Sequence, residues 1–158
     1  MGITYNKMLQ MQKKSSLLYA IGIDTGTNTG VAIWDCRAKK FALVQTMAIH
    51  EAVFLVQSYV DKAKKNGELQ RLLVRVEDAR QRKWFGARSS SKLQGAGSVK
   101  RDSAIWDDYL KSTGVMYRMV SPANNTTKMD AAAFRRYTGY TGSTNEHNRD
   151  AAMLVFGT

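Results

Sequence analysis

The sequence has 158 residues, of which 44% are hydrophobic and 23% charged, a composition that fits one folded domain and excludes a disordered tail. Lys and Arg number 24 against 13 Asp and Glu, and the formal net charge of +11 favours a polyanionic partner such as nucleic acid. The single cysteine excludes an internal disulfide, and no apolar run reaches the ~20 residues of a membrane span, so we predict a cytoplasmic protein without a membrane partner.

Residues 1–17 are predicted to be an N-terminal tail, because they lack the sustained apolar core and the cleavage site of a secretory signal. Residues 18–158 are predicted to form one domain. It begins with three apolar runs at 18–24, 30–34 and 41–49, and the turn-forming segments between them indicate an antiparallel meander. A helix is expected at 50–65, where valines recur at helical spacing before the Lys and Gly residues of a helix end.

The second half of the chain alternates strands and helices. The Leu- and Val-rich run at 71–78 predicts a buried strand, and the Arg-, Ser- and Gly-rich segment at 79–97 predicts an exposed loop. A helix at 98–113, a strand at 114–122 and two helices at 126–139 and 144–157 complete the chain. Because parallel strands need crossover connections, this order predicts an α/β fold with a mixed sheet flanked by helices.

Acidic residues fall at three places where a shared site can form. Asp24 and Glu77 lie at the carboxyl ends of two predicted strands, where ligands of open α/β sheets gather. His147 and Asp150 are three apart and share a helix face with apolar residues expected to pack on the sheet. Each also has an ordinary interpretation: Asp24 as a turn residue, Glu77 as a strand-end charge, and the pair as a polar helix start.

Taken together, the three acids point to bound divalent cations. In one cleft Asp24, Glu77 and Asp150 would repel one another strongly unless cations neutralised them. Oxygen ligands suit Mg²⁺ or Mn²⁺, and His147 is an acceptable ligand for Mn²⁺. Two such ions ~3.5–4 Å apart activate a water and stabilise the leaving oxygen of a phosphodiester. A centre of this kind in a basic chain predicts a nuclease with two metal ions per site.

Four segments of the chain follow one another in a specific order: GIDTGTNTGVAIWD (22–35), LLVRVEDAR (72–80), VSPANNTTK (120–128) and NEHNRDAAML (145–154). In order and spacing they resemble the motifs of RuvC-type Holliday junction resolvases, in the ribonuclease H-like superfamily. The resemblance spans nearly everything from residue 19 onward. It implies a five-stranded sheet in the order 3-2-1-4-5, a homodimer, and paired symmetric nicks in four-way DNA junctions, in a bacterial cell or a phage-infected bacterium.

By this resemblance Asp24, Glu77 and Asp150 match the acids of the family's first strand, fourth strand and last helix. His147 matches a position that members fill with histidine or aspartate, and it would act as a fourth metal ligand or as a proton carrier. Lys128 falls where the family has a lysine after the fifth strand, placed to neutralise charge near the scissile phosphate. The alternative for Lys128 is a solvated lysine in the first turn of a helix.

The segment after Glu77 combines basic side chains with two adjacent aromatic rings. Basic groups bind phosphates, while an exposed ring stacks on an unpaired base. The resemblance supports this role, because the family uses an aromatic residue here to hold the junction open. Either ring is a candidate, and the alternative is that both pack on the domain. The predicted DNA-binding residues are Arg80, Arg82, Lys83, Trp84, Phe85, Arg88, Lys92, Lys100 and Arg101.

Three other functions compete with junction cleavage. The segment GIDTGTNTG also resembles the first phosphate loop of sugar kinases and actin-like ATPases, but 158 residues leave no room for a second lobe, so no nucleotide cofactor is expected. Another ribonuclease H-like nuclease, acting on structured RNA or other branched DNA, would share the fold and the metals. A DNA-binding module without activity is disfavoured, because its clustered carboxylates would repel DNA.

Overall fold

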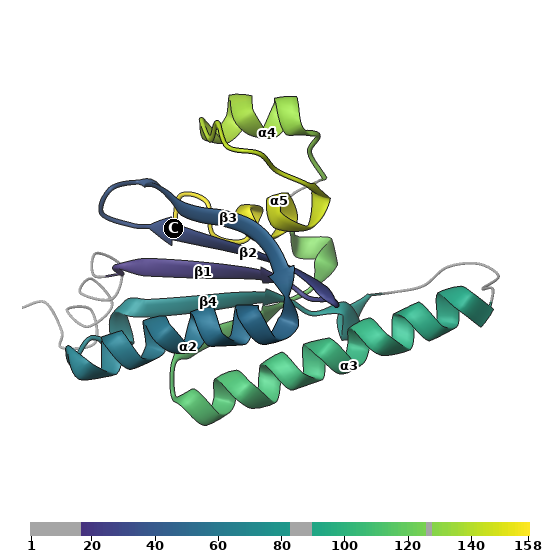
Figure 1. Cartoon of the computed structure of the whole chain (residues 1–158), viewed down its shortest axis with the longest axis horizontal. Coiled ribbons are helices and arrows are strands. Elements are labelled where there is room, and N and C mark those ends of the chain that lie inside the picture. The colour runs from purple at the N-terminus through teal and green to yellow at the C-terminus, as the bar shows by residue number, and fades with distance from the viewer. Residues whose placement is uncertain (1–16, 83–89, 126–127) are drawn as a thin grey trace, which may run out of the picture.

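The computed structural model describes residues 17–82, 90–125 and 128–158, so nearly all of the predicted tail lies outside it (Figure 1). Five strands form one sheet in the order β3-β2-β1-β4-β5. β1 (Tyr19–Asp24), β2 (Asn28–Asp35) and β3 (Lys40–Ala48) pair antiparallel, whereas β4 (Leu72–Glu77) and β5 (Met116–Val120) run parallel to β1. The predicted meander, mixed sheet and strand order are confirmed.

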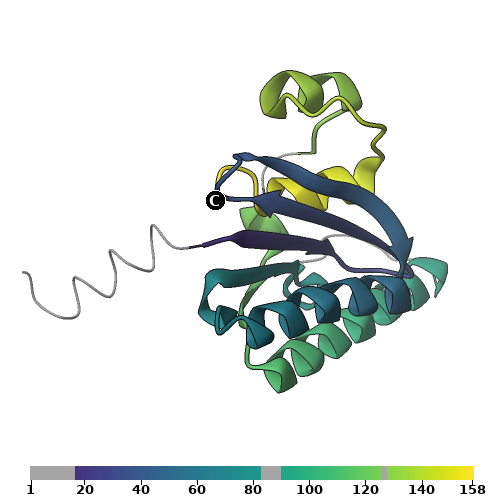
Figure 2. The same ribbon diagram turned by 60° about the vertical axis from the view of Figure 1, so that its left-hand side comes forward.

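Helices cover both faces of the sheet (Figures 1 and 2). α2 (Ile49–Lys65) and α3 (Ser90–Thr113) lie side by side on one face. α5 (Glu146–Met153) packs on the other face, and α4 (Ala131–Thr138) stands farther out beyond it. The one-turn helices are η1 (Leu69–Arg71), η2 (Ala79–Gln81) and η3 (Pro122–Asn124). In the described part of the chain, no helix is long and apolar enough to cross a membrane.

The side chains of the central strands alternate between two cores. Ile21 and Ile23 of β1 and Val76 of β4 point toward α2 and α3 and belong to the larger core. The intervening positions point toward α5, where a second, smaller core forms. Asp24 and Glu77 continue this alternation at the strand ends. The two acids therefore lie on the α5 face of the sheet.

The structure differs from the predicted elements mainly at helix ends. α3 begins at Ser90, so the prediction of a loop is wrong for residues 90–97. This stretch begins with two serines and contains Gly95 and Gly97, and these residue types are weaker helix formers than alanine or leucine. The sequence of this stretch therefore shows no clear helical pattern. The last helix ends at Met153 instead of continuing to 157. Its final residues form turns that bury Leu154 and Val155 in the smaller core.

Candidate functional site

Asp24 and Glu77 end two neighbouring strands at the same edge of the sheet. β1 and β4 run parallel, and their register pairs Asp24 directly with Glu77. The two residues are only 9% and 7% exposed. The fold therefore brings two carboxylates together at a buried strand edge, where the parallel arrangement predicted that they would meet.

α5 reaches this edge because two glycines let its backbone lie directly on the sheet. A Cβ atom at Gly22 of β1 would stand 2.0 Å from the carbonyl oxygen of Ala151. At Gly30 of β2, a Cβ atom would stand 2.1 Å from the carbonyl oxygen of His147. A side chain at either position would push the helix away. The glycines thus place the first turns of α5 over the two strand ends.

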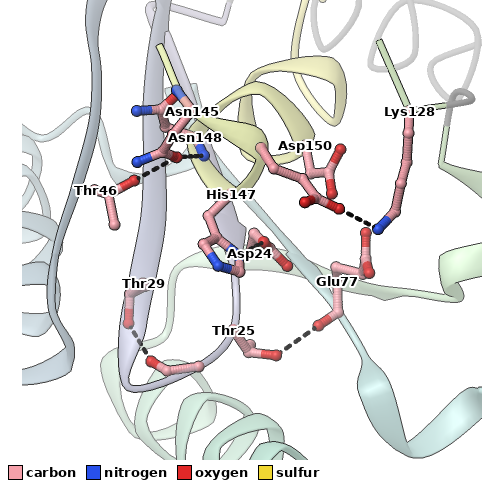
Figure 3. A network of polar contacts seen from close by, with 12 residues as sticks. Asp24, Thr25, Thr29, Thr46, Glu77, Lys128, Asn145, His147, Asn148 and Asp150 are labelled. Atoms are coloured by element: carbon pink, nitrogen blue, oxygen red, sulfur yellow. Dashed lines mark hydrogen bonds and ion pairs between the residues drawn. The ribbon is translucent and has the colours of Figure 1, made fainter. Parts of the chain in front are cut away.

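The amino end of α5 is held by a capping box that is tied to the sheet (Figure 3). The Asn145 side chain accepts a hydrogen bond from the Asn148 backbone N–H at 3.1 Å, and the Asn148 side chain accepts one from the Asn145 N–H at 2.9 Å. The Thr46 hydroxyl of β3 donates to Asn145 Oδ1 at 2.9 Å. These bonds fix the helix start against the strands, and with it the backbone position of His147.

The side chains from these elements line one pocket of about 160 Å³ (Figure 3). Asp24, Glu77, His147 and Asp150 all belong to its wall, so the structure brings the four predicted metal ligands to one place. Lys128 lines the same pocket. The other lining residues are Thr25, Ala79, Arg82, Val99 and Glu146.

Burial and mutual repulsion raise the pKa of two carboxyl groups in this pocket. The pKa of Asp24 rises from 3.8 to about 7, first because the group is buried and second because Glu77 lies beside it. His147 Nδ1 lies 3.0 Å from Asp24 Oδ2, and this bond opposes the rise without cancelling it. The pKa of Asp150 is also raised, by burial and then by Glu77. The protein alone therefore compensates the negative charge of the pocket only in part.

Glu77 is held by Asn125, a residue for which sequence reasoning assigned no role. Asn125 Nδ2 donates to Glu77 Oε2 at 2.9 Å and to the backbone carbonyl of Asp150 at 3.2 Å. The second carboxylate oxygen of Glu77 lies 3.5 Å from Arg82 Nη2. Asn125 follows η3 in an irregular segment, so no periodicity marks it. Its position within the segment VSPANNTTK is the only feature of the sequence that could have indicated a role in the site.

Asn125→Asp is expected to destabilise the fold by about 2 kcal/mol or more at pH 8 without divalent cations, because it replaces a donor to Glu77 with a further carboxylate. The loss should shrink at pH 5, where the added carboxyl and Asp24 take up protons. Urea unfolding at both pH values measures the effect. Asn124→Asp adds the same charge at an exposed neighbouring position and should cost less than about 0.5 kcal/mol. Equal losses in both variants would contradict the role of Asn125.

The four predicted ligands in the pocket suit a hard divalent cation, because they combine the carboxylates of Asp24, Glu77 and Asp150 with the imidazole of His147. Among the described residues, however, no group of three or more His, Cys, Asp or Glu side chains is arranged so that it could hold a metal ion as it stands. Asp24 bonds to His147 and Glu77 bonds to Asn125 instead. Metal binding would therefore require these side chains to turn toward a common point.

Lys128 is exposed at the rim of the pocket and forms an ion pair with Glu146. This contact raises the pKa of the lysine, and the nearby Asp150 adds to the effect. The interpretation of Lys128 as a first-turn helix residue is wrong, because α4 begins at Ala131 with Asp130 as its N-cap. A phosphate entering the pocket would compete with Glu146 for the ammonium group.

The predicted DNA-binding residues differ in how the structure places them. Arg80 is engaged within the domain, because its guanidinium lies 2.8 Å from Asp78 and 2.9 Å from Asp107. Arg82 lines the pocket, and Lys100 and Arg101 are exposed on α3 next to the pocket wall. Residues Lys83, Trp84, Phe85 and Arg88, and the side chain of Lys92, lie outside the described part of the chain. The DNA contacts of all nine residues stay predictions.

The chain was compared with protein families, with curated proteins and with solved structures. No family model and no curated protein matches the sequence. Among solved structures, the chain is similar to RuvC of T. thermophilus in complex with a Holliday junction substrate, with a TM-score of 0.51 and 15% sequence identity. The match covers 89% of this chain and 91% of that one. Together with the strand order β3-β2-β1-β4-β5, it shows that this chain has the α/β, ribonuclease H-like fold of its RuvC neighbour.

Proposed function

We propose that this chain is a metal-dependent endonuclease that cuts branched DNA, with the four-way junction as its preferred substrate. The proposal rests on one observation: Asp24 of β1, Glu77 of β4 and Asp150 of α5 line one pocket with the imidazole of His147, in a chain whose net charge is +11. Such a pocket repels a phosphate backbone unless cations stand between them, while the basic surface attracts it. The fold shared with RuvC, whose structure contains a Holliday junction, supports the choice of substrate.

The residues of the pocket would have different roles in phosphodiester hydrolysis. Asp24, Glu77 and Asp150 would hold Mg²⁺ or Mn²⁺, and bound ions of this kind activate a water and stabilise the leaving oxygen. His147 uses Nδ1 to contact Asp24, and its side chain is 54% exposed, so its other ring nitrogen is placed to take a metal ion or a proton. Lys128 at the rim is placed to neutralise a phosphate oxygen.

Symmetric cuts across a junction need two active sites, so we propose that two copies act together. Phe54 of α2 is 75% exposed and Ile105 of α3 is 45% exposed. Both line an apolar groove together with Ile49 and Val53. α2 and residues 98–113 of α3 carry acids as well as bases, so two copies of this basic chain can meet there without strong repulsion. The apolar groove lined by Ile49, Val53, Phe54 and Ile105 is the proposed dimer interface.

Phe54→Glu is expected to weaken dimer formation by about 2 kcal/mol or more, since it buries a charge in an apolar contact. Size-exclusion chromatography with light scattering at several protein concentrations measures the change. Met116→Glu alters another exposed apolar residue, on β5, and should leave the dimer intact. A monomeric wild type, or an equally strong dimer in Phe54→Glu, would contradict the interface.

The proposed activity is tested by offering the purified protein several substrates with Mg²⁺ or Mn²⁺. A synthetic four-way junction, a flap, a linear duplex and a structured RNA are incubated in parallel, and the cut positions are mapped. Paired symmetric nicks in the junction are expected. Cleavage of the RNA with no cleavage of the junction would replace this proposal with an RNA-processing nuclease. ATP turnover without any nuclease activity would point to nucleotide binding instead.

A further inference from the structure

A groove of about 510 Å³ lies between α4 and the segment that follows it. Its floor is formed by Phe134, which is buried, and by alanines of α4. The polar residues that line it carry guanidinium and hydroxyl groups and include no acid: Arg135, Arg136, Tyr140, Ser143 and Thr144. This set consists of the donors that recognise phosphate oxygens in nucleic-acid complexes.

The two arginines bring positive charge that no acid of the described residues neutralises. Both are exposed, and neither forms an ion pair with an acid in residues 17–82, 90–125 or 128–158. Arg135 Nη2 donates to the carbonyl oxygen of Thr141 at 2.9 Å, which ties its guanidinium to the segment that follows α4. Asp130 is the single acid of segment 128–145, and its side chain is used to cap α4.

The segment that forms the groove is fastened to α5 at both ends. Arg149 of α5 donates through Nε to the carbonyl oxygen of Met129 at 2.9 Å and through Nη1 to the Thr144 hydroxyl at 3.0 Å. Because the Thr144 hydroxyl accepts this bond, its own proton is left to donate. Phe134 and Tyr140 pack on each other with ring centroids 6.3 Å apart. The groove is therefore held in a fixed position relative to the helix that carries His147 and Asp150.

The groove and the acidic pocket are also close along the chain. Thr144 lines the groove, while Glu146 and His147 line the pocket. Three residues span at most about 11 Å, since consecutive Cα atoms are about 3.8 Å apart. A DNA strand presents a phosphate about every 3.4 Å along the helix axis, and the winding of the strand makes the direct distance between successive phosphates larger. A strand with one phosphate at the pocket can therefore place a phosphate from one of the next few nucleotides at the groove.

We infer that the α4 groove is a second binding site for the nucleic-acid backbone, which holds the duplex arm next to the phosphate in the acidic pocket. This inference rests on the proposed function, because it takes the pocket as the point of cleavage. Arg135 and Arg136 would contact phosphates with their planar guanidinium groups. The hydroxyls of Ser143, Thr144 and Tyr140 would add neutral hydrogen bonds. The groove fixes which phosphate of the arm reaches the carboxylates.

The double variant Arg135→Ala/Arg136→Ala tests this role through the salt dependence of binding. Affinity for a fluorescent four-way junction is measured in EDTA at several KCl concentrations. Each lost phosphate contact should reduce the slope of log affinity against log salt by about 0.9, so a reduction of about 2 is expected. The matched control, Lys64→Ala/Lys65→Ala, removes the same charge at the end of α2 on the opposite face and should leave the slope unchanged.

Two further variants separate charge from structure. Arg136→Ala alone leaves the Arg135 bond to Thr141 in place, so it should fold normally and reduce the slope by about 1. Arg135→Lys/Arg136→Lys keeps the charge and should restore most of the slope. An unchanged slope in the alanine variants, or an equal loss in the α2 control, would overturn the inference. Because binding is measured without cleavage, a chain that binds the junction through this groove but never cuts would refute only the proposed function.

Discussion

Asp24→Asn is expected to lower junction cleavage by about a thousandfold or more while leaving junction binding as tight as in the wild type, or tighter. Asp24 ends β1 in register with Glu77, and it is the most strongly perturbed carboxyl group of the pocket. An amide of the same shape keeps the packing but removes a charge that holds metal ions, and losses of this size follow when a group acting at the reacting centre is removed. Removing negative charge also weakens repulsion of the DNA backbone.

Cleavage rates and binding affinities of Asp24→Asn are compared with those of Asp108→Asn. The control makes the same chemical change at an exposed residue of α3 and should behave as the wild type. Unchanged cleavage by Asp24→Asn would remove Asp24 from the active site. A loss of binding as large as the loss of cleavage would instead indicate that the variant disturbs the fold.

The same substitution should also change how the stability of the protein depends on pH, which can be measured without any substrate. The pKa of Asp24 is 3.8 before folding and about 7 in the folded state, so the folded protein binds the proton more tightly and wild-type stability falls as pH rises through this range. One pKa unit corresponds to about 1.4 kcal/mol, so an ionised Asp24 costs up to about 4 kcal/mol above pH 7. In EDTA at pH 8, Asp24→Asn should therefore unfold at higher urea concentration than the wild type, and at pH 4 the difference should vanish.

Gly30→Ala is expected to destabilise the fold by about 3 kcal/mol or more, and to abolish cleavage in any molecules that still fold. The added Cβ would stand 2.1 Å from the carbonyl oxygen of His147 and 2.5 Å from its carbonyl carbon. Both atoms belong to the backbone, so the clash can be relieved only by moving α5 away from β2. Such a shift would carry His147 and Asp150 away from the strand carboxylates.

Thermal or urea unfolding, followed by a cleavage assay at a temperature where the variant is folded, measures both effects of Gly30→Ala. Gly97→Ala is the matched control, because a Cβ at that position of α3 meets no atom within 4 Å. Alanine is also the better helix former, so the control should gain about 0.5–1 kcal/mol. Wild-type stability and activity in Gly30→Ala would mean that α5 does not rest on β2 as described.

The sequence predicted those features that depend on local pattern. Buried strands such as β4 consist of nearly unbroken apolar residues, which is why they could be found from the sequence. Asp24 and Glu77 could be paired from the sequence, because neighbouring parallel strands bring their carboxyl ends to one edge. His147 and Asp150 followed from their spacing on one helix face. The resemblance to junction resolvases supplied the strand order, which periodicity alone does not give.

Features that depend on contacts between distant segments were not predicted. Asn125 bonds to Glu77 across 48 residues, and apart from its position within VSPANNTTK no local pattern marks it as a site residue. The roles of Gly22 and Gly30 become visible only when α5 is placed on the sheet. The start of α3 was missed because Gly95 and Gly97 are weak helix formers, so the local sequence does not indicate a helix there. The position of the groove beside α4 likewise depends on contacts between segments, because Arg149 of α5 bonds to Met129 before the groove and to Thr144 at its end.

We propose that Asp24, Glu77 and Asp150 form a metal-dependent centre that cuts branched DNA. Mapping the cuts that the wild type and Asp24→Asn make in one labelled four-way junction, with Mg²⁺ and with EDTA, tests this assignment. Two symmetric nicks are expected from the wild type with Mg²⁺, and none from the wild type in EDTA or from the variant in either condition. Nicks that persist in EDTA or in Asp24→Asn would contradict this assignment, as would a wild type that binds the junction with Mg²⁺ but leaves it intact.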